Sequence, residues 1–524
     1  MGGVAARECS VHVGSGHVLV VAPHGGLRAI AAPHQRTNDL HSGDLAEAIA
    51  DALDASWIVN HGLDRNVLDL NRVSEVRDRA PWFAECLGEA LQRILSRHEV
   101  ACVVFVHGWH VMQPRCDIGV GARLDGPAEA DAKAELLTAS PSWLREHVEP
   151  LRSACAALGI RATYGERWPG AHPNNLLQAF RRKARRSHGG VFAGLARHAA
   201  SGRVEAMQLE LGAPLRWPGR LRDEFVRICA RALGARSPAP ELPLEVEAVP
   251  PRRASPHRTA ASRAALQIHD PRAGTHGIGI IAGIAHLPDG ATGARLVIFP
   301  GGSRMAIFVG HARGHGPLAV DGLRIESRAD GSLELAFEGH ALLAEDAASY
   351  FRDERAQAAA QLVAVAATLS YQPIEASGYG RVDGRVALAG RSLGVNGGGF
   401  TTPFLAPSRP GSRSHTRALA SFGGAVGIVA DTGAEALCLA AGGCEPLGRA
   451  ELLEGRDPGS DGFALEFAGA ERLECLPLNR VQLWRSLPDG EAVRVTFGVA
   501  RFRWSRGGEG SGFYERVESD GSPG

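Results

Sequence analysis

The sequence predicts an α/β first half and a mainly β second half. Residues 17–235 alternate short apolar runs with stretches of helical period, a pattern typical of a sheet flanked by helices. From Gly277 onward the pattern changes to short alternating runs broken by glycine, proline and Asp-Gly pairs, which indicates β-structure. Between the two patterns, a stretch rich in proline, alanine and arginine has no sustained period. We therefore expect a first domain over residues 1–236, a linker over 237–275 and a second domain over 276–524.

Several segments of the first half have a clear strand or helix pattern. His17–Ala22 and Val100–Val106 are short, β-branched apolar runs of the kind found in buried parallel strands, and Arg203–Leu211 predicts a third strand. Helical patterns cover four further segments: Ser42–Ala55, Pro81–His98, Ser140–Leu158 and Pro218–Leu233. Ser140 can cap the third of these helices, with Pro141 at its first position. The expected architecture is a mixed sheet with helices on both faces.

The second half predicts a β-sandwich or a β-barrel. Its strand-like runs are Gly277–Ala285, Ala294–Phe299, Met305–Val309, Leu333–Phe337, Gln361–Leu369 and Ala492–Arg503. Asp-Gly pairs, which favour tight hairpin turns, begin at residues 289, 321, 330, 383, 461 and 489.

Composition excludes several classes of function. Lys and Arg together number 57, as do Asp and Glu, so the overall charge does not favour nucleic acid as a partner. No run approaches the roughly 18 apolar residues of a membrane span. The nine cysteines are scattered and form no C-x-x-C pair, which argues against a disulfide framework and a structural cysteine-zinc site. We expect a cytoplasmic protein.

Polar motifs follow the predicted strands of the first half, where α/β sheets place their ligands. In chain order they are Pro23-His24-Gly25-Gly26, Asp39-Leu40-His41-Ser42-Gly43-Asp44-Leu45-Ala46, Asp69-Leu70-Asn71-Arg72, His107-Gly108-Trp109-His110, Asp117-Ile118-Gly119 and Gln208-Leu209-Glu210.

Taken together and in this order, the motifs resemble those of the N-formylglutamate amidohydrolases and, more distantly, of zinc carboxypeptidases and aspartoacylase. The resemblance covers roughly residues 17–215 and implies a fold of the zinc-exopeptidase type. The family shows P-H-S-G, D-x-x-T-x-x-L-A, D-L-N-R, D-x-H-S, a D-x-x-I-G-T-like segment and Q-x-E. This sequence departs from that pattern at several positions, among them Ser42 for threonine, Phe105 for aspartate and Ala122 for threonine.

A hydrolytic zinc ion needs three nitrogen or oxygen ligands from the protein and one open position for water. His24, Asp39 and His107 satisfy that count from separate segments. His110 is an alternative to His107, which we favour because it directly ends the apolar strand. Asp44 is an alternative to Asp39, and either aspartate could instead cap a helix.

The resemblance implies roles for three more residues. Glu210 corresponds to the general base that takes a proton from metal-bound water, and a carboxylate on an apolar strand is costly without such a role. Asn71 and Arg72 correspond to the pair that binds a substrate carboxylate, which a guanidinium can bind in bidentate fashion. A surface position for Glu210 and a structural ion pair for Arg72 are the alternatives.

The second half has a weaker resemblance, to carotenoid 1,2-hydratase-like, lipocalin-type β domains. It rests on the segment 378–391 and on the closing Gly512-Phe-Tyr-Glu, and it implies a domain that could hold a hydrophobic ligand. The polar R-D-H-S-W-G-like element of that family is missing, so its chemistry does not carry over. The sequence as a whole predicts a zinc-dependent hydrolase that cleaves a C–N amide bond in a small, carboxylate-bearing N-acyl amino acid. The alternative is a binding or scaffold protein that retains a degenerate hydrolase domain.

Overall fold

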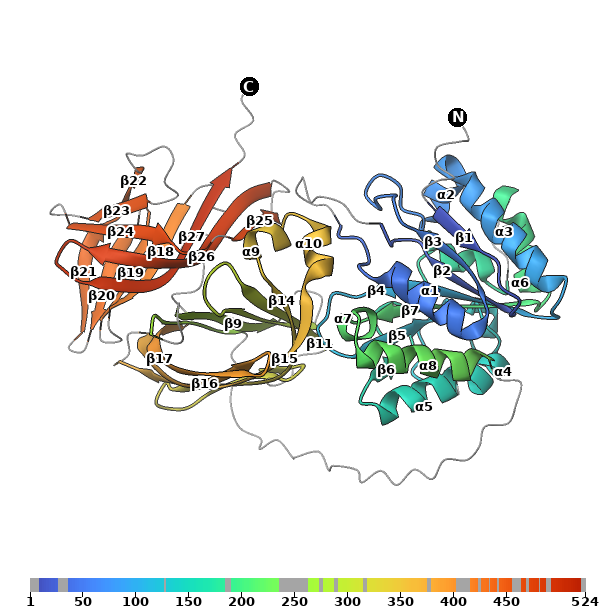
Figure 1. Ribbon diagram of the computed structural model, residues 1–524, viewed down its shortest axis with the longest axis horizontal. Helices are drawn as coiled ribbons and strands as arrows, with labels where there is room; N and C mark the ends of the chain where they lie inside the picture. The colour runs from blue at the N-terminus through green and yellow to red at the C-terminus, as the bar shows by residue number, and fades with distance from the viewer. Residues whose placement is uncertain are drawn as a thin grey trace. The chain divides into compact units, whose positions relative to one another are not determined.

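The chain folds into two compact units, one formed mainly by residues up to Thr259 and the other from Ala260 onward (Figure 1). The structure is a computed structural model, and it describes residues 9–26, 36–126, 129–183, 190–234, 263–272, 277–286, 291–313, 318–374, 378–401, 415–422, 426–432, 434–440, 443–454, 463–467, 471–479, 481–486 and 492–519.

The first unit is built on a seven-stranded mixed sheet with the order β1-β3-β2-β4-β7-β5-β6. Its centre, β3-β2-β4-β7, is parallel, whereas β1 and β5 run antiparallel to their neighbours β3 and β7. The strands are β1 (Cys9–His12), β2 (Val18–Ala22), β3 (Ser56–Asn60), β4 (Ala101–Gly108), β5 (Arg115–Gly119), β6 (Arg161–Thr163) and β7 (Val204–Leu211).

Helices cover both faces of this sheet, because both faces of its central strands are apolar. Val20 and Val104 pack on one face against α1, α5 and α8, while Leu19 and Val103 pack on the other against α2, α3 and α6 (Figure 1). The helices are α1 (Ser42–Leu53), α2 (Val73–Arg79), α3 (Pro81–Leu95), α4 (Pro141–Trp143), α5 (Glu149–Ala157), α6 (Ala193–Ala200), α7 (Ala213–Arg216) and α8 (Arg220–Gly234), with short turns of other helix types at η3 (Ala134–Leu136), η4 (Leu144–Val148), η5 (Leu176–Phe180) and η7 (Gly190–Phe192). Ser140 caps α4 by accepting a hydrogen bond from the Trp143 amide, as predicted.

The second unit contains two antiparallel sheets, each described with ten strands. In the first sheet, β11 pairs with both β10 and β14, and this second pairing closes a barrel. Its elements are β8 (Arg263–Asp270), β9 (Ile278–His286), β10 (Ala291–Phe299), β11 (Met305–Arg313), β12 (Ala319–Val320), β13 (Leu323–Ser327), β14 (Leu333–Ala344), α9 (Ala347–Tyr350), α10 (Glu354–Ala359), β15 (Gln361–Pro373), β16 (Tyr379–Leu388) and β17 (Arg391–Thr401).

The second sheet curls into a nearly closed barrel with its own apolar core. Ile428, Leu447, Phe463 and Phe502 come from four different strands and belong to the same buried cluster. The strands are β18 (His415–Phe422), β19 (Val426–Asp431), β20 (Glu435–Ala440), β21 (Gly443–Arg449), β22 (Glu451–Glu454), β23 (Phe463–Phe467), β24 (Glu471–Pro477), β25 (Val481–Ser486), β26 (Ala492–Trp504) and β27 (Glu509–Ser519).

The predicted fold classes are confirmed, with barrels rather than a sandwich in the second half. Two details differ from the sequence analysis. The linker predicted over 237–275 lies partly outside the described residues, but Arg263–Asp270 forms β8, so the second unit begins before residue 276. The pair Asp383-Gly384 lies within β16 and makes no hairpin turn. The Asp-Gly pairs at 289, 461 and 489 fall outside the described residues.

All nine cysteines are free thiols. Among the described helices, none has both the length and the apolar character that crossing a membrane requires.

Candidate metal and hydrolytic site

The parallel centre of the first sheet brings three candidate residues to one edge. β2 pairs with β4, and β4 pairs with β7, so the carboxyl ends of the three strands lie side by side. His24 follows β2, His107 is the next-to-last residue of β4, and Glu210 is the next-to-last residue of β7. His107 and Glu210 are direct partners in the strand register. Distant parts of the sequence therefore meet where an α/β sheet places its chemistry.

Asp39 joins the two histidines into a buried cluster. Its Oδ2 atom lies 3.1 Å from His24 Nδ1 and 3.1 Å from His107 Nδ1. The loop that carries Asp39 is held in place because its amide donates to the His24 carbonyl oxygen at 2.9 Å. All three side chains are at most 5% exposed. One carboxylate oxygen is thus the common neighbour of two imidazole nitrogens.

Asp69 holds the other nitrogen of the His24 ring. His24 Nε2 and Asp69 Oδ1 are 2.7 Å apart, and Arg72 Nε donates to Asp69 Oδ2 at 3.3 Å. A carboxylate that accepts from one ring nitrogen favours the tautomer whose lone pair is on the other, and this arrangement orients histidine ligands in metal sites. Here that lone pair is on Nδ1, the atom that faces Asp39.

The contact between His24 Nδ1 and Asp39 requires a positive charge. If the Nε2 proton points to Asp69, a neutral His24 would bring a lone pair against the Asp39 carboxylate, and only a second ring proton or a cation can bridge the two. Burial is the largest single influence and lowers the pKa of His24, but the Asp39 and Asp69 carboxylates together outweigh it, so the pKa is raised. The pKa of Asp39 is well below its usual range, because the two histidines and Arg65 outweigh its own burial. The cluster therefore requires either a protonated His24 or a bound cation.

The residues present fit a zinc ion. His24, Asp39 and His107 each offer one ligand atom, and these atoms lie within 4.8 Å of one another. Ligands of a tetrahedral zinc ion, each about 2.0–2.1 Å from the metal, are about 3.3 Å apart. The two measured separations of 3.1 Å from Asp39 Oδ2 are close to that value. In addition, His107 Nε2 is buried without a hydrogen-bond partner in the described part of the chain.

Glu210 has the environment of a proton acceptor. Its backbone pairs with His107 on one side and with Asp117 on the other. Burial is the largest influence on Glu210; together with Asp39 and Asp117 it outweighs His107 and Arg65, and the pKa of Glu210 is raised to about 7. A carboxylate that titrates near neutral pH can both take up and release a proton.

The structure separates the candidate ligands from their alternatives. His110 is exposed and does not belong to the cluster. Asp44 lies in the first turn of α1 with its side chain 60% exposed, and its carboxylate pairs with His41 at 3.0 Å. Geometry thus groups His24, Asp39 and His107, as the sequence analysis expected, without testing the roles assigned to them.

Asn71 and Arg72 lie next to the cluster, through Asp69. The Asn71 amide donates to Asp69 Oδ1 at 3.0 Å, and the Asn71 side-chain oxygen is buried with no partner among the described residues. The Arg72 side chain is 31% exposed and contacts Asp69 through Nε. Both side chains therefore retain hydrogen-bonding groups that a ligand could use.

Two other motif residues hold loops in place. Asp117 is buried and accepts hydrogen bonds from the Thr163 hydroxyl and from the amides of Glu166, Arg167 and Trp168. Gln208 donates to the Trp168 carbonyl oxygen at 2.9 Å. These two residues fix the segment 163–168 against the sheet.

Sequence analysis missed two arginines. Arg65 donates to Asp39 Oδ1 at 2.9 Å, which leaves Oδ2 to the histidines. Arg216 is fully buried and donates to the carbonyl oxygens of Leu211, Leu40 and Trp109. Burial lowers the pKa of Arg216 to about 10, so it stays charged at neutral pH. Neither arginine belongs to a motif, and backbone carbonyl partners leave no trace in a sequence.

No protein-family model matches the chain, and no curated protein matches it. Among solved structures, the chain is similar to N-formylglutamate amidohydrolase from Ralstonia eutropha JMP134, with 14% identity, a TM-score of 0.30 and coverage of 43% of this chain and 96% of that one. It is also similar to kievitone hydratase from Nectria haematococca, with 11% identity, a TM-score of 0.30 and coverage of 49% of this chain and 88% of that one. At low identity and partial coverage, these similarities agree with both parts of the resemblance found in the sequence.

Proposed function

We propose that the first unit is a metal-dependent amidohydrolase that cleaves the C–N amide bond of a small N-acyl amino acid or a similar carboxylate-bearing substrate. The observation that carries this proposal is the buried cluster of His24, Asp39 and His107, with Glu210 opposite His107 in the neighbouring strand. A cytoplasmic location is part of the proposal, because nine free thiols suit a reducing compartment.

In this proposal, His24, His107 and Asp39 hold a zinc ion, which when bound supplies an activated water and polarises the amide carbonyl. Asp69 keeps the His24 ring in the tautomer that presents Nδ1. Glu210 accepts a proton from the attacking water and delivers it to the leaving amine nitrogen. Arg72 and Asn71 bind the substrate carboxylate and so orient the scissile bond.

A non-catalytic binding or scaffold protein is the second candidate, and one observation favours it. Each residue of the cluster already has a partner. Both ring nitrogens of His24 face carboxylates, His107 Nδ1 faces Asp39, and Asp39 also pairs with Arg65. With His24 protonated, such a network can persist without a metal.

Metal analysis combined with activity separates the two candidates. The purified full-length chain should hold about one zinc ion per chain and hydrolyse at least one member of an N-acyl amino acid panel. His24→Ala and His107→Ala should lose both zinc and activity. Glu210→Gln should keep zinc and lose activity by about 10²–10⁴-fold, the usual contribution of one general base.

The outcomes against the proposal are equally clear. A wild-type protein that binds no zinc, or full activity of Glu210→Gln on a substrate of the wild type, would refute the mechanism. The His110→Ala variant is a matched control, because His110 lies three residues from His107 but outside the cluster. It should keep full zinc.

A further inference from the structure

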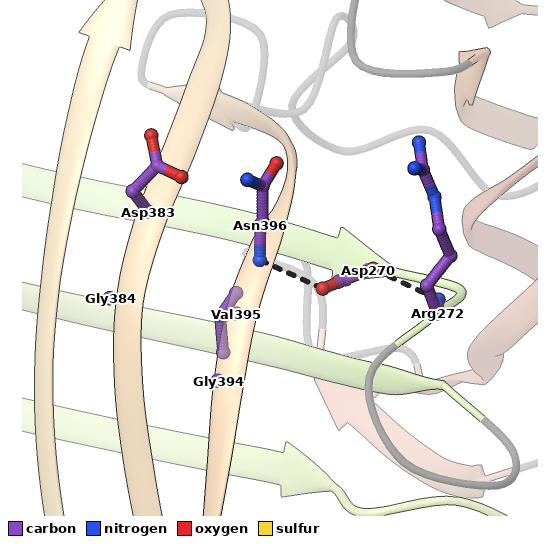
Figure 2. A pocket seen from close by; sticks show the side chains of 7 residues that line it. All are labelled: Asp270, Arg272, Asp383, Gly384, Gly394, Val395 and Asn396. Atoms are coloured by element: carbon purple, nitrogen blue, oxygen red, sulfur yellow. Dashed lines mark hydrogen bonds between the residues drawn. The ribbon is translucent and has the colours of Figure 1, made fainter.

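The second unit contains a small polar cavity between its two sheets. The cavity has a volume of about 140 Å³ and is lined by His269, Arg272, Arg381, Asn396, Gly398 and Ser421, among others. Ser421 belongs to β18 of the second sheet, and the other residues named come from the first sheet or the loop after β8. A shallower hollow of about 500 Å³ shares Arg272 and Asn396 with it and is lined further by Asp270 and Asp383 (Figure 2).

The glycines of β17 make room for this cavity. A side chain at Gly398 would clash with Ser421 Oγ and would come within 2.6 Å of the Tyr379 hydroxyl oxygen. A side chain at Gly397 would clash with the backbone carbonyl of His269. Ser421 Oγ and the Tyr379 hydroxyl are hydrogen-bonded to each other at 2.7 Å. The absence of a side chain at Gly398 thus allows β17 of the first sheet to approach Ser421 of the second.

His269 is a buried polar group in the wall of the cavity. It is 4% exposed, and its ring packs edge-on against Phe513 with ring centroids 6.3 Å apart. Its Nδ1 atom has no hydrogen-bond partner among the described residues. Burial lowers the pKa of His269 to about 4, so the ring is neutral at pH 7, with one nitrogen a donor and the other an acceptor. Because an unsatisfied buried polar atom is unfavourable, a ligand with a complementary group would stabilise this wall.

The cavity carries positive charge that nothing in its lining neutralises. Arg272 and Arg381 both line it and are exposed, and neither forms an ion pair with another described residue. Asp270 precedes Arg272 by two residues but forms no ion pair with it; its two oxygens accept from the backbone amides of Arg272 and Asn396, as Figure 2 shows. No carboxylate lines the cavity itself.

We propose that this cavity binds a small oxyanion, a carboxylate or a phosphate, through the guanidinium groups of Arg272 and Arg381 and through hydrogen bonds with His269 and Ser421. Guanidinium groups pair with both kinds of anion in bidentate fashion. Sequence resemblance predicted a hydrophobic ligand for this half; the charged lining of this cavity suits a different class of ligand.

The test uses the full-length chain and isothermal titration calorimetry with two probes, inorganic phosphate and butyrate. All proteins carry Arg72→Gln, so that the proposed carboxylate contact of the first unit does not contribute. Arg381→Gln removes one charge from the cavity. Arg385→Gln is the matched control, because Arg385 is an exposed arginine of the same strand that does not line the cavity.

We expect at least one probe to bind, and we expect Arg381→Gln to weaken its binding by about tenfold or more while Arg385→Gln leaves it unchanged. Binding of phosphate alone or of butyrate alone identifies the kind of anion. His269→Gln, checked for an unchanged melting transition, should weaken the same probe. Absence of binding for both probes at about 10 mM, or equal weakening by Arg381→Gln and Arg385→Gln, would overturn the proposal. None of these results depends on zinc or amidohydrolase activity.

Discussion

Asp69→Asn is the most informative single change in the first unit, because it tests the metal proposal without replacing a proposed metal ligand. Asp69 Oδ1 is 2.7 Å from His24 Nε2, and the Asp69 side chain is only 4% exposed. Burial disfavours the charged carboxylate, yet its contact with His24 holds the pKa of Asp69 well below the usual range. Asparagine keeps the size and one acceptor oxygen, which can still accept from His24 Nε2, but it removes the charge and replaces the oxygen that accepts from Arg72 Nε by an NH2 group.

The magnitude follows from the difference between two kinds of hydrogen bond. A hydrogen bond to a charged group contributes about 1.5–3 kcal/mol net, and one between neutral groups about 0.5–1.5 kcal/mol. The change should therefore weaken the support of His24 as a ligand by about 1–1.5 kcal/mol. This difference corresponds to a loss of about tenfold in zinc affinity. This loss lies at the lower end of the 10–100-fold loss in metal affinity that is usual when a residue hydrogen-bonded to a histidine ligand is replaced.

Competition with a chromophoric zinc chelator would measure that affinity. The matched control is Asp78→Asn, a nearby exposed aspartate paired with Arg77 at 2.7 Å, which should bind zinc like the wild type. Unchanged affinity of Asp69→Asn, in a protein whose His24→Ala variant has lost zinc, would show that Asp69 does not support the ligand. An equal loss of zinc affinity in Asp78→Asn would show that the effect comes from the change in overall protein charge rather than from the contact with His24.

Three further predictions concern the same site, and a fourth concerns the boundary between the two units. Because Glu210 must be ionised to act as a base, and burial raises its pKa to about 7, kcat/KM should fall as the pH drops through and below about 7, and Glu210→Gln should remove this acid limb. Arg72→Lys keeps the charge but loses the planar guanidinium that can bind a carboxylate through two nitrogens. Therefore kcat/KM should fall by about tenfold or more for N-acyl amino acids and remain unchanged for their amidated forms, with zinc content as control. Gly108→Ala should lower both activity and the melting temperature, because the new methyl group would lie 2.7 Å from Arg216 Nη1; retention of both would show that the guanidinium can move at little cost. Limited proteolysis should cut first within residues 237–262 and leave two stable fragments; earlier cuts elsewhere would contradict the boundary.

Much of the fold was predictable, because buried strands and amphipathic helices repeat with local periods. β2 and most of β4 are continuous apolar runs, since helices cover both faces of the sheet. What the sequence did not show depends on contacts between distant segments. The closure of the first barrel rests on the pairing of Met305 with Ala344 and its neighbours, which no local pattern encodes. The pair Asp383-Gly384 has the composition of a turn, but its partner strand β15 keeps it extended.

The same distinction applies to the site. That His24 and His107 lie at the same edge of the sheet was predictable, because one follows and the other closes an apolar strand, although their roles stay predictions. The choice between His107 and His110, and between Asp39 and Asp44, could not be settled by position in a motif, since the members of each pair are only three and five residues apart in the sequence. Only the folded chain separates them: Asp44 turns to His41 at the start of α1, while Asp39 meets both histidines.

Arg216 illustrates a kind of residue that sequence patterns cannot reveal. Its three acceptors are backbone carbonyls, and each belongs to a segment that carries a candidate site residue: Leu40 follows Asp39, Trp109 follows His107 by two positions, and Leu211 follows Glu210. One buried guanidinium therefore ties together the segments that must keep their positions to within a fraction of an ångström for a metal site to form. Lysine could not replace it, because a single ammonium group cannot span three separated carbonyls as a planar guanidinium does. The absence of a side chain at Gly108 leaves the space that this guanidinium fills.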